Sequence, residues 1–146
     1  MKVKTSLVMA VPPERAYDVY ADYAGWPRVF PTISAVRLVR RAGNSVVLEV
    51  DHRSEGKVRN ELVLQPKRQL ELRESKRRYD ARFLNRFDPI NSGTRVSVAG
   101  DIRLKGLVRL LSPLLGWYVR RLIQRFTLHP IKIAAEAGKR QPRKTS

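Results

Sequence analysis

Up to residue 104, hydrophobic positions mostly alternate with polar ones, which is the pattern of strands that bury one face. Glycine, proline and asparagine separate the alternating runs at short intervals. Successive strands joined by short turns indicate an antiparallel sheet with one dry face and one face in water. The predicted strands are residues 2–11, 35–41, 45–53, 57–65, 69–76, 79–87 and 94–104.

Two short helices are predicted between the first and second strands. Pro13 and Glu14 suit the first turn of a helix, because proline loses no hydrogen bond there and the acid interacts favourably with the helix dipole. Residues 25–27 (GWP) are expected to break this helix before a second one that carries residues 29–30. The two helices would form a bent cap on the sheet.

Residues 107–139 suit a long helix. Ser112 and Pro113 match an N-cap followed by proline at the first helical position. Apolar residues then recur every three or four positions and form a stripe that another part of the fold must cover. Pro130 interrupts the pattern, so a kink or break is expected at residues 128–130. The stripe consists of Leu115, Tyr118, Leu122, Phe126, His129 and Ile133.

Together these elements predict an α+β fold, in which a curved antiparallel sheet wraps round a long C-terminal helix and two short helices follow the first strand. A chain of 146 residues with 42% hydrophobic residues can bury a core of its own. We therefore expect a single domain over residues 1–137, and a basic mobile tail over residues 138–146.

The chain is strongly basic, with a formal net charge of +17 and a pI near 11.2. From residue 103 onward, eleven Lys or Arg residues stand against one acid, Glu136. Such a charge attracts anionic partners, namely nucleic acid, acidic lipid or an acidic protein. The alternative is that the arginines reflect the base composition of the genome and cover a solvated face.

Several kinds of site are excluded by composition. The absence of cysteine excludes disulfides, thiolate metal sites and cysteine nucleophiles. The phosphate-binding glycine loop and the GxSxG and HExxH motifs are missing as well. With only His52 and His129 available, no metal ion and no cofactor are expected. Without an 18-residue apolar run or a signal-peptide core, the expected location is cytoplasmic, at most peripheral to a membrane.

Polar residues occupy strand positions that are predicted to face the long helix. Burying them costs free energy unless they pair with each other, with water or with a ligand, so they indicate a cavity for a mostly apolar molecule with a polar end. Alternatively, His52 and Glu74 lie at the sheet rim and reach solvent, and a register shift of one residue would turn the whole set outward. The polar set is His52, Asn60, Glu74, Tyr79 and Asn85. The predicted ligand-binding residues are this set with Leu48, Val50, Leu62, Leu72, Phe83, Val98, Leu115, Tyr118, Leu122 and Phe126.

The opening of the chain, AVPPERAY at residues 10–17 and DYAGWPRVFP at residues 22–31, resembles that of the START/Bet v 1-like (SRPBCC) superfamily. Within it, the chain is similar to the polyketide cyclase/dehydrase and coenzyme Q-binding (Coq10-like) branch. GTRV at residues 93–96 and AE at residues 135–136 resemble the family's last strand and the end of its final helix.

The resemblance implies a helix-grip fold with a cavity between sheet and helix for lipids, isoprenoids, sterols or polyketides. It also implies structural roles in the cap for four residues. They are Asp22, Trp26, Pro27 and Pro31.

Three functions are open at this point. The leading hypothesis is binding or transport of a hydrophobic small molecule such as a lipid, an isoprenoid or quinone, or a polyketide. The second is a polyketide cyclase/dehydrase-type enzyme, for which no catalytic residue is assigned and His52, Glu74 and Tyr79 are weak acid–base candidates. The third is an RNA- or ribosome-associated protein, which the charge favours and the lack of an aromatic stacking platform does not.

The start of the long helix is predicted to contact an anionic membrane surface. Trp117 lies there close to Arg120, Arg121 and Arg125, and helices that lie in the membrane interface combine aromatic and basic residues in this way. Such a contact would let cargo pass between membrane and cavity. The alternative for Trp117 is a place in the core. No oligomeric state is predicted.

Overall fold

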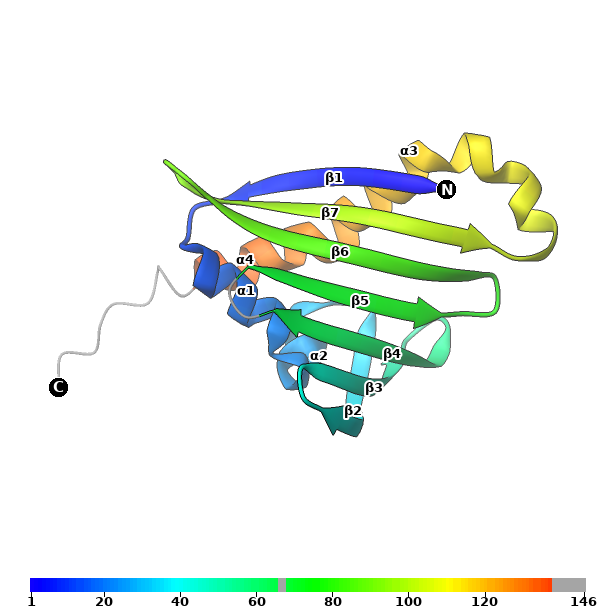
Figure 1. Cartoon of the computed structure of the whole chain (residues 1–146), viewed down its shortest axis with the longest axis horizontal. Coiled ribbons are helices and arrows are strands. Elements are labelled where there is room, and N and C mark those ends of the chain that lie inside the picture. Colours follow the sequence, from blue (N-terminus) through cyan, green and yellow to red (C-terminus); the bar gives the residue numbers. More distant parts are fainter. Residues whose placement is uncertain (66–67, 138–146) are drawn as a thin grey trace, which may run out of the picture.

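The computed structural model describes residues 1–65 and 68–137, and its main feature is one curved antiparallel sheet (Figure 1). The sheet has seven strands in the order β1-β7-β6-β5-β4-β3-β2, so the last strand of the meander returns beside the first. The strands are β1 (Lys2–Met9), β2 (Ile33–Ala42), β3 (Ser45–His52), β4 (Gly56–Gln65), β5 (Gln69–Ser75), β6 (Tyr79–Ile90) and β7 (Gly93–Leu104).

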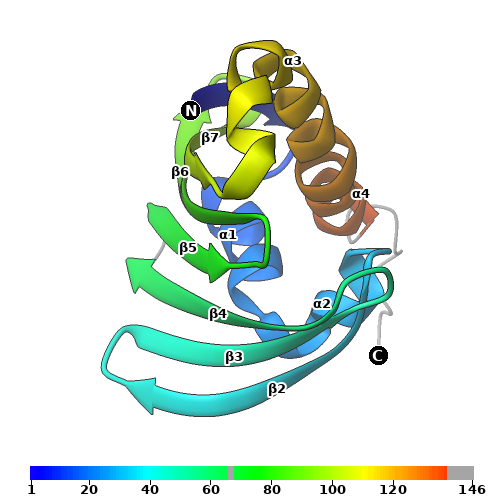
Figure 2. The same ribbon diagram turned by 90° about the vertical axis from the view of Figure 1, so that its right-hand side faces the viewer.

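The sheet curls round the helices, which lie on its concave side (Figure 2). Two short helices and a 3-10 turn cover one end of the sheet, and the C-terminal helical elements run along its length. The first group is α1 (Pro13–Ala21), η1 (Tyr23–Gly25) and α2 (Trp26–Val29); the second is η2 (Gly106–Leu111), α3 (Ser112–Ile123), η3 (Gln124–Leu128) and α4 (His129–Ala137). This is the predicted helix-grip α+β architecture, so the fold prediction is confirmed.

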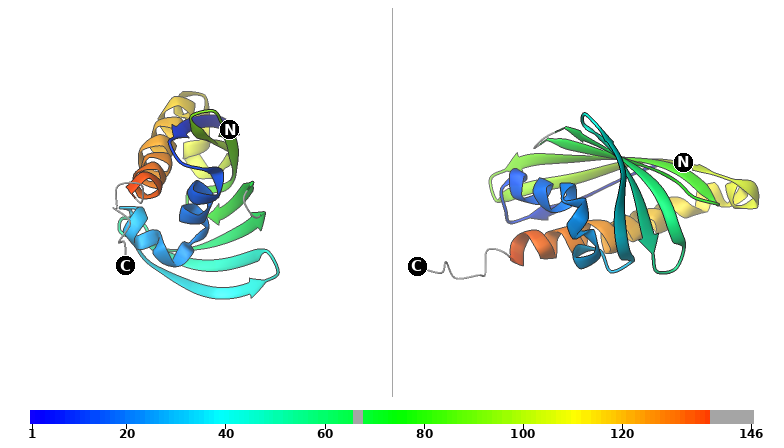
Figure 3. Two further views of the ribbon diagram at one scale, coloured as in Figure 1. Left: turned by 90° about the vertical axis from the view of Figure 1, so that its left-hand side faces the viewer. Right: turned by 90° about the horizontal axis from the view of Figure 1, so that it is seen from below.

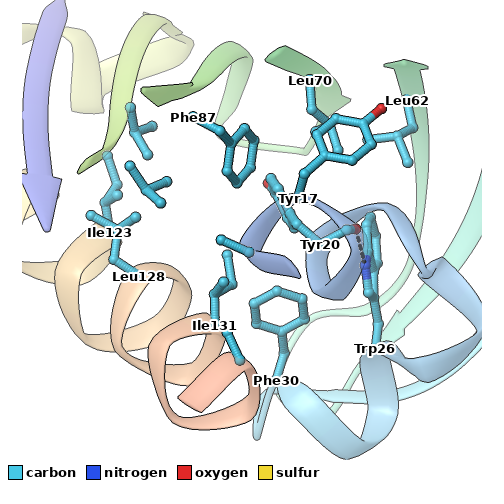
Figure 4. Close-up of a cluster of buried hydrophobic side chains, with 14 of the residues drawn as sticks. Tyr17, Tyr20, Trp26, Phe30, Leu62, Leu70, Phe87, Ile123, Leu128 and Ile131 are labelled. Atoms are coloured by element: carbon cyan, nitrogen blue, oxygen red, sulfur yellow. Dashed lines mark hydrogen bonds between the residues drawn. The ribbon is translucent and has the colours of Figure 1, made fainter. Parts of the chain in front are cut away.

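The core lies between the concave face, the cap and the long helix (Figure 4). Strand β3 shows the predicted alternation, because Val46, Leu48 and Val50 are fully buried. The cap contributes Trp26, whose Nε1 donates a hydrogen bond of 2.8 Å to the carbonyl oxygen of Tyr20. The two rings stack with centroids 5.9 Å apart. Trp26 was expected to lie in a helix break but begins α2, with Pro27 in the first turn, where proline is tolerated.

The first and last segments that resemble the family, residues 10–17 and residues 135–136, contact each other in the structure. Nε of Arg15 in α1 donates a hydrogen bond of 2.6 Å to the carbonyl oxygen of Ala135 in α4. The backbone N–H of Ala10 donates to Oε1 of Glu136 at 2.9 Å. These bonds join segments more than a hundred residues apart, and they fix the end of the long helix against the start of α1.

The GTRV segment begins β7 where the backbone of another strand comes very close. Gly93 has φ +145°, and a Cβ atom there would lie 2.1 Å from the carbonyl oxygen of Met9. Only glycine fits such an approach without a shift of the backbone. The next residue, Thr94, is fully buried and its hydroxyl donates a hydrogen bond of 2.7 Å to the carbonyl oxygen of Val11.

A kink or break was predicted at residues 128–130; a break is wrong there, because the chain is helical from Gly106 to Ala137. The irregularity lies one turn earlier, in the π-helical segment η3. Proline at position 130 cannot donate the ordinary bond to the preceding turn, and a wider turn accommodates both the missing bond and the ring. Gln124 anchors this turn to β1, since its Nε2 donates a hydrogen bond of 2.8 Å to the carbonyl oxygen of Ser6.

The predicted stripe of the long helix is wrong in part. Tyr118, His129 and Ile133 are exposed, whereas other positions pack against the sheet and cap. The start of the helix is apolar on two faces, so periodicity alone did not distinguish the covered face. The π turn adds a residue and rotates the pattern after it. The buried positions are Ile123, Leu128, Pro130, Ile131 and Ala135, with Val119 partly buried.

The convex face of the sheet carries cross-strand ion pairs. Arg37 lies 3.2 Å from Glu49, and Arg82 lies 2.8 Å from Glu71.

No helix in the described residues has the length and apolarity needed to cross a bilayer. The expected tail, residues 138–146, lies outside the part of the chain that the structure describes.

Candidate ligand-binding cavity

A cavity of about 410 Å³ lies between the concave face of the sheet and the long helix. Its size falls in the range of small-molecule pockets, roughly 300–1,000 Å³. Most of its wall is apolar or aromatic, and the cap, the sheet and the helix all contribute. Representative wall residues are Trp26, Phe30, Leu72, Phe83, Val98 and Phe126.

The cavity reaches the surface at the end of the sheet where β3, β5 and β7 all finish. These strands run in the same direction, because each neighbouring pair in the sheet is antiparallel. Ser54 and Glu55, which follow β3, line the cavity and are exposed. Four polar residues gather at this end and are called the mouth cluster below. They are Glu55, Glu74, Lys76 and Tyr79.

Hydrogen bonds and charge pairs connect the mouth cluster. The hydroxyl of Tyr79 donates a hydrogen bond of 2.9 Å to Oε1 of Glu74. Nζ of Lys76 lies 2.8 Å from Oε2 of Glu55 and 4.0 Å from Oε1 of Glu74. Burial, followed by the negative charge of Glu74, raises the pKa of Tyr79 well above its usual value. The phenol therefore stays protonated and acts as a hydrogen-bond donor.

Three buried polar atoms that belong to cavity-lining residues have no hydrogen-bond partner within the described residues. They are Nε2 of His52, Oδ1 of Asn60 and Oδ1 of Asn85. Asn60 and Asn85 are 2% and 1% exposed, so bulk water does not reach these amides freely. The amide nitrogen of Asn85 donates to the carbonyl oxygen of Leu70 at 3.3 Å, which fixes one end of that side chain.

Two further titratable side chains that line the cavity, His52 at the end of β3 and Tyr20 in α1, are neutral. Burial, and secondarily the charge of Lys76, lowers the pKa of His52 below its ordinary value of 6.5. Burial and then the charge of Glu74 raise the pKa of Tyr20, which also lines the cavity. At neutral pH the interior therefore presents an uncharged imidazole, two amides and a phenol.

All five of the polar residues predicted to face inward line this one cavity. Of the full predicted set, the cavity is lined by His52, Asn60, Leu72, Glu74, Tyr79, Phe83, Asn85, Val98, Leu122 and Phe126. Leu48, Val50 and Leu62 lie on the expected face but are fully buried in the core, away from the cavity wall. Leu115 and Tyr118 do not line it either, and Tyr118 faces solvent. Periodicity identifies the inward face but does not distinguish filled core from cavity.

The sequence prediction missed the contribution of the cap to the cavity. Tyr20, Trp26 and Phe30 line it, although Trp26 was expected to be only structural. The aromatic run in residues 17–30 was the available signal, because such rings suit an apolar wall. Lys76 was missed as well, although it lies in the predicted strand 69–76, two residues after Glu74 and on the same predicted face.

Metal binding has no visible basis in residues 1–65 and 68–137. Within them, no group of three His, Asp or Glu side chains comes together as metal ligands would. The chemistry that the cavity offers is instead that of hydrogen bonding, apolar contact and proton transfer through the mouth cluster.

A family model described as polyketide cyclase / dehydrase and lipid transport matches residues 1–136. The chain belongs to this family. No curated protein sequence matches it. Solved structures from the wider START/Bet v 1-like superfamily share the fold of this chain. Neither the family match nor these structures single out the coenzyme Q-binding branch.

Similar solved structures share the fold at low sequence identity. The Zhui aromatase/cyclase from Streptomyces sp. R1128 is 14% identical, with a TM-score of 0.77 and 96% of each chain covered. The di-domain ARO/CYC StfQ of the steffimycin biosynthetic pathway is 18% identical, with a TM-score of 0.75 over 94% of this chain and 51% of that one. A START superfamily protein from Mycobacterium smegmatis is 16% identical, with a TM-score of 0.63 over 94% and 95%.

Proposed function

We propose that this polyketide cyclase / dehydrase and lipid transport family member binds a hydrophobic small molecule that carries uncharged oxygen groups. The observation that carries the proposal is the set of unpaired buried polar atoms on His52, Asn60 and Asn85 around one cavity. Buried polar groups in folded proteins nearly always have partners. Hydroxyl groups of a ligand would donate to the two amide oxygens, and a ligand hydroxyl or carbonyl would pair with Nε2 of His52.

The cavity chemistry supports a neutral ligand over a charged one. His52 is uncharged at neutral pH, the charge of Lys76 is balanced by Glu55 at 2.8 Å, and the Glu74 carboxylate at the mouth already accepts a hydrogen bond from Tyr79. Affinity would come mainly from apolar burial against the aromatic and aliphatic walls, at roughly 25 cal/mol for each Å² removed from water. Lipids, isoprenoid quinones and polyketides all combine an apolar body with hydroxyl or carbonyl oxygens. Release and transfer of such a ligand would make the protein a carrier.

Native mass spectrometry tests this proposal on protein purified at high salt, which removes bound nucleic acid. A small molecule that co-purifies and is recovered in an organic extract is the expected result. Its occupancy should fall when Asn60 and Asn85 are both replaced by Leu, which removes two of the unpaired acceptors. Arg59→Leu, next to Asn60 but on the exposed convex face, is the matched control and should leave occupancy unchanged. Equal occupancy in all three proteins would contradict the proposal.

A cyclase/dehydrase activity is the second candidate, supported by the Tyr79–Glu74 hydrogen bond of 2.9 Å at the cavity mouth. In such an enzyme the Glu74 carboxylate would accept a proton from the carbon beside a ligand carbonyl. The Tyr79 hydroxyl would turn from Glu74 and donate its one hydrogen bond to the ligand oxygen that gains charge. Neutral His52 is the other candidate base. Glu74→Gln and His52→Ala should abolish turnover of an enzyme but only weaken ligand retention by a carrier.

Association with RNA or a ribosome has less support. The net charge of +17 favours it. Among the large hydrophobic residues described as exposed, however, the aromatic ones are Trp117 and Tyr118, and neither lies on the sheet. A stacking platform of the kind that single-stranded RNA needs is therefore lacking in this part of the chain. Binding that disappears between low and physiological salt, without sequence preference, would identify it as nonspecific electrostatic attraction.

A further inference from the structure

Six large apolar side chains face solvent where the long helix begins. The set, called the helix-start patch below, is Leu107, Leu110, Leu111, Leu114, Trp117 and Tyr118. Their exposed fractions run from 47% for Tyr118 to 85% for Leu107. Through η2 and α3 they recur every three or four residues, with the adjacent pairs 110–111 and 117–118, so they share one side of the helical segment.

A neighbouring side of the same segment already meets the rest of the protein. Leu115, Val119 and Leu122 are partly buried there, and Val119 and Leu122 line the cavity. The segment is thus apolar on two sides while the sheet covers only one. It also projects past the ends of the strands (Figure 3). A contiguous apolar surface of this kind on a folded chain marks a contact with a protein, a ligand or a membrane.

The charged residues of the segment that carries the helix-start patch are all positive. No acidic residue occurs between Asp101 and Glu136. Arg109, Arg120 and Arg121 are exposed on this segment, and none of them forms an ion pair with another described residue. The patch therefore combines an apolar surface with arginines whose charge is not neutralised locally.

We propose that the helix-start patch docks on the surface of an anionic lipid bilayer. The leucines would enter the boundary between headgroups and acyl chains, and the arginines would contact anionic headgroups. Trp117 and Tyr118, whose rings meet edge to face with centroids 6.1 Å apart, suit this boundary because each has an apolar body and a polar atom.

The chemistry favours a bilayer over other occupants. A second copy of the chain would bring like-charged arginines of both copies together, which opposes self-association through this surface. RNA offers no partner for four exposed leucines. Docking would also place the cavity near the membrane, because Leu104, which lines the cavity, is separated from the 3-10 segment only by Lys105. The docking proposal does not depend on which ligand the cavity holds.

Vesicle binding by the full chain tests the proposal. Sedimentation with vesicles of phosphatidylcholine and phosphatidylglycerol is expected, and much weaker sedimentation with phosphatidylcholine alone. The fluorescence of Trp117 should shift to shorter wavelength on binding, while Trp26 is buried and should not respond. Trp117→Phe identifies the source of the shift.

Two variants, one double and one triple, separate the apolar contribution to vesicle binding from the contribution of charge. Leu110→Ser with Leu114→Ser should reduce vesicle affinity at least about tenfold, since two leucines lose their contact with lipid. Arg109→Gln, Arg120→Gln and Arg121→Gln together should reduce it about 100-fold, because each arginine near an anionic surface strengthens binding. All of these side chains are exposed, so the fold should survive; circular dichroism checks this.

The matched controls are remote from the helix-start patch. Ile133→Ser changes an equally exposed residue of α4, and Arg40→Gln, Arg59→Gln and Arg95→Gln remove the same charge from exposed strand positions. Both controls should bind vesicles nearly as the parent protein does, as should Asn60→Leu in the cavity. If the strand arginine variant lost as much vesicle affinity as the triple variant of Arg109, Arg120 and Arg121, general electrostatic attraction would explain the binding and the proposal would be overturned. A concentration-dependent dimer that the leucine variant abolishes, or binding of an acidic protein without affinity for vesicles, would also overturn it.

Discussion

Asn60 is the position where a single substitution should stabilise the empty protein and weaken its function. Its side chain is 2% exposed, and Oδ1 has no partner among the described residues. In the sheet it lies between Leu48 of β3 and Glu74 of β5. Leucine has the same branching as asparagine and so can occupy the site without repacking. The substitution Asn60→Leu replaces an unpaired polar group by an apolar one of similar shape.

The expected gain follows from the cost of an unsatisfied buried group. That cost is about 1–3 kcal/mol, and leucine adds a few tenths of a kcal/mol through its preference for strands. The free energy of unfolding of the ligand-free protein should therefore rise by roughly 2 kcal/mol. For a chain of this size the melting temperature should rise by about 4–8 °C. Ligand affinity should fall roughly threefold to tenfold, because one hydrogen bond to the ligand is lost.

Urea unfolding of extracted, ligand-free protein, followed by circular dichroism, measures the stability change. An unchanged slope against urea would show that the unfolded state is not altered. Arg59→Leu controls for strand preference, since it changes the adjacent, exposed side chain and should stay within about 1 kcal/mol of the parent. If ligand-free Asn60→Leu were less stable than the parent while ligand binding stayed unchanged, the amide would have a structural partner such as an ordered water, and the reasoning would be refuted.

Three further outcomes are expected. Because burial lowers the pKa of His52 in the folded state, the unfolded chain binds the proton more tightly. The free energy of unfolding should therefore fall as the pH drops from about 7 through the folded-state pKa. His52→Gln should reduce this pH dependence, as measured by urea unfolding across the same range. Tyr79→Phe removes the hydrogen bond to Glu74 and should cost about 1–2 kcal/mol in the same assay, whereas a cost near zero would mean that the bond is absent in solution. Gly93→Ala should lower the free energy of unfolding by roughly 3 kcal/mol or more, measured by thermal unfolding, because the added Cβ would lie 2.1 Å from a backbone oxygen. A variant as stable as the parent would contradict the close approach to β1.

Local patterns determined the sheet and its inward face. Alternation along a strand fixes which side chains share a face, so the period of two was enough to put His52, Asn60 and Asn85 on the concave side. Turn residues fixed where the meander reverses. The motif at residues 10–17 pointed to the right superfamily, and the structure explains part of it through the contact of Arg15 with Ala135.

The tertiary structure alone decided how the inward face divides between core and cavity. Leu48 and Asn60 are register partners on neighbouring strands, yet the first packs into the core and the second lines the cavity. Which of them is covered depends on where the cap and the long helix lie, and those contacts join residues far apart in the chain. The phase of the long helix depends on the same contacts. Its first turns are apolar on both sides, and only the position of the sheet determines that Val119 turns inward and Trp117 remains exposed.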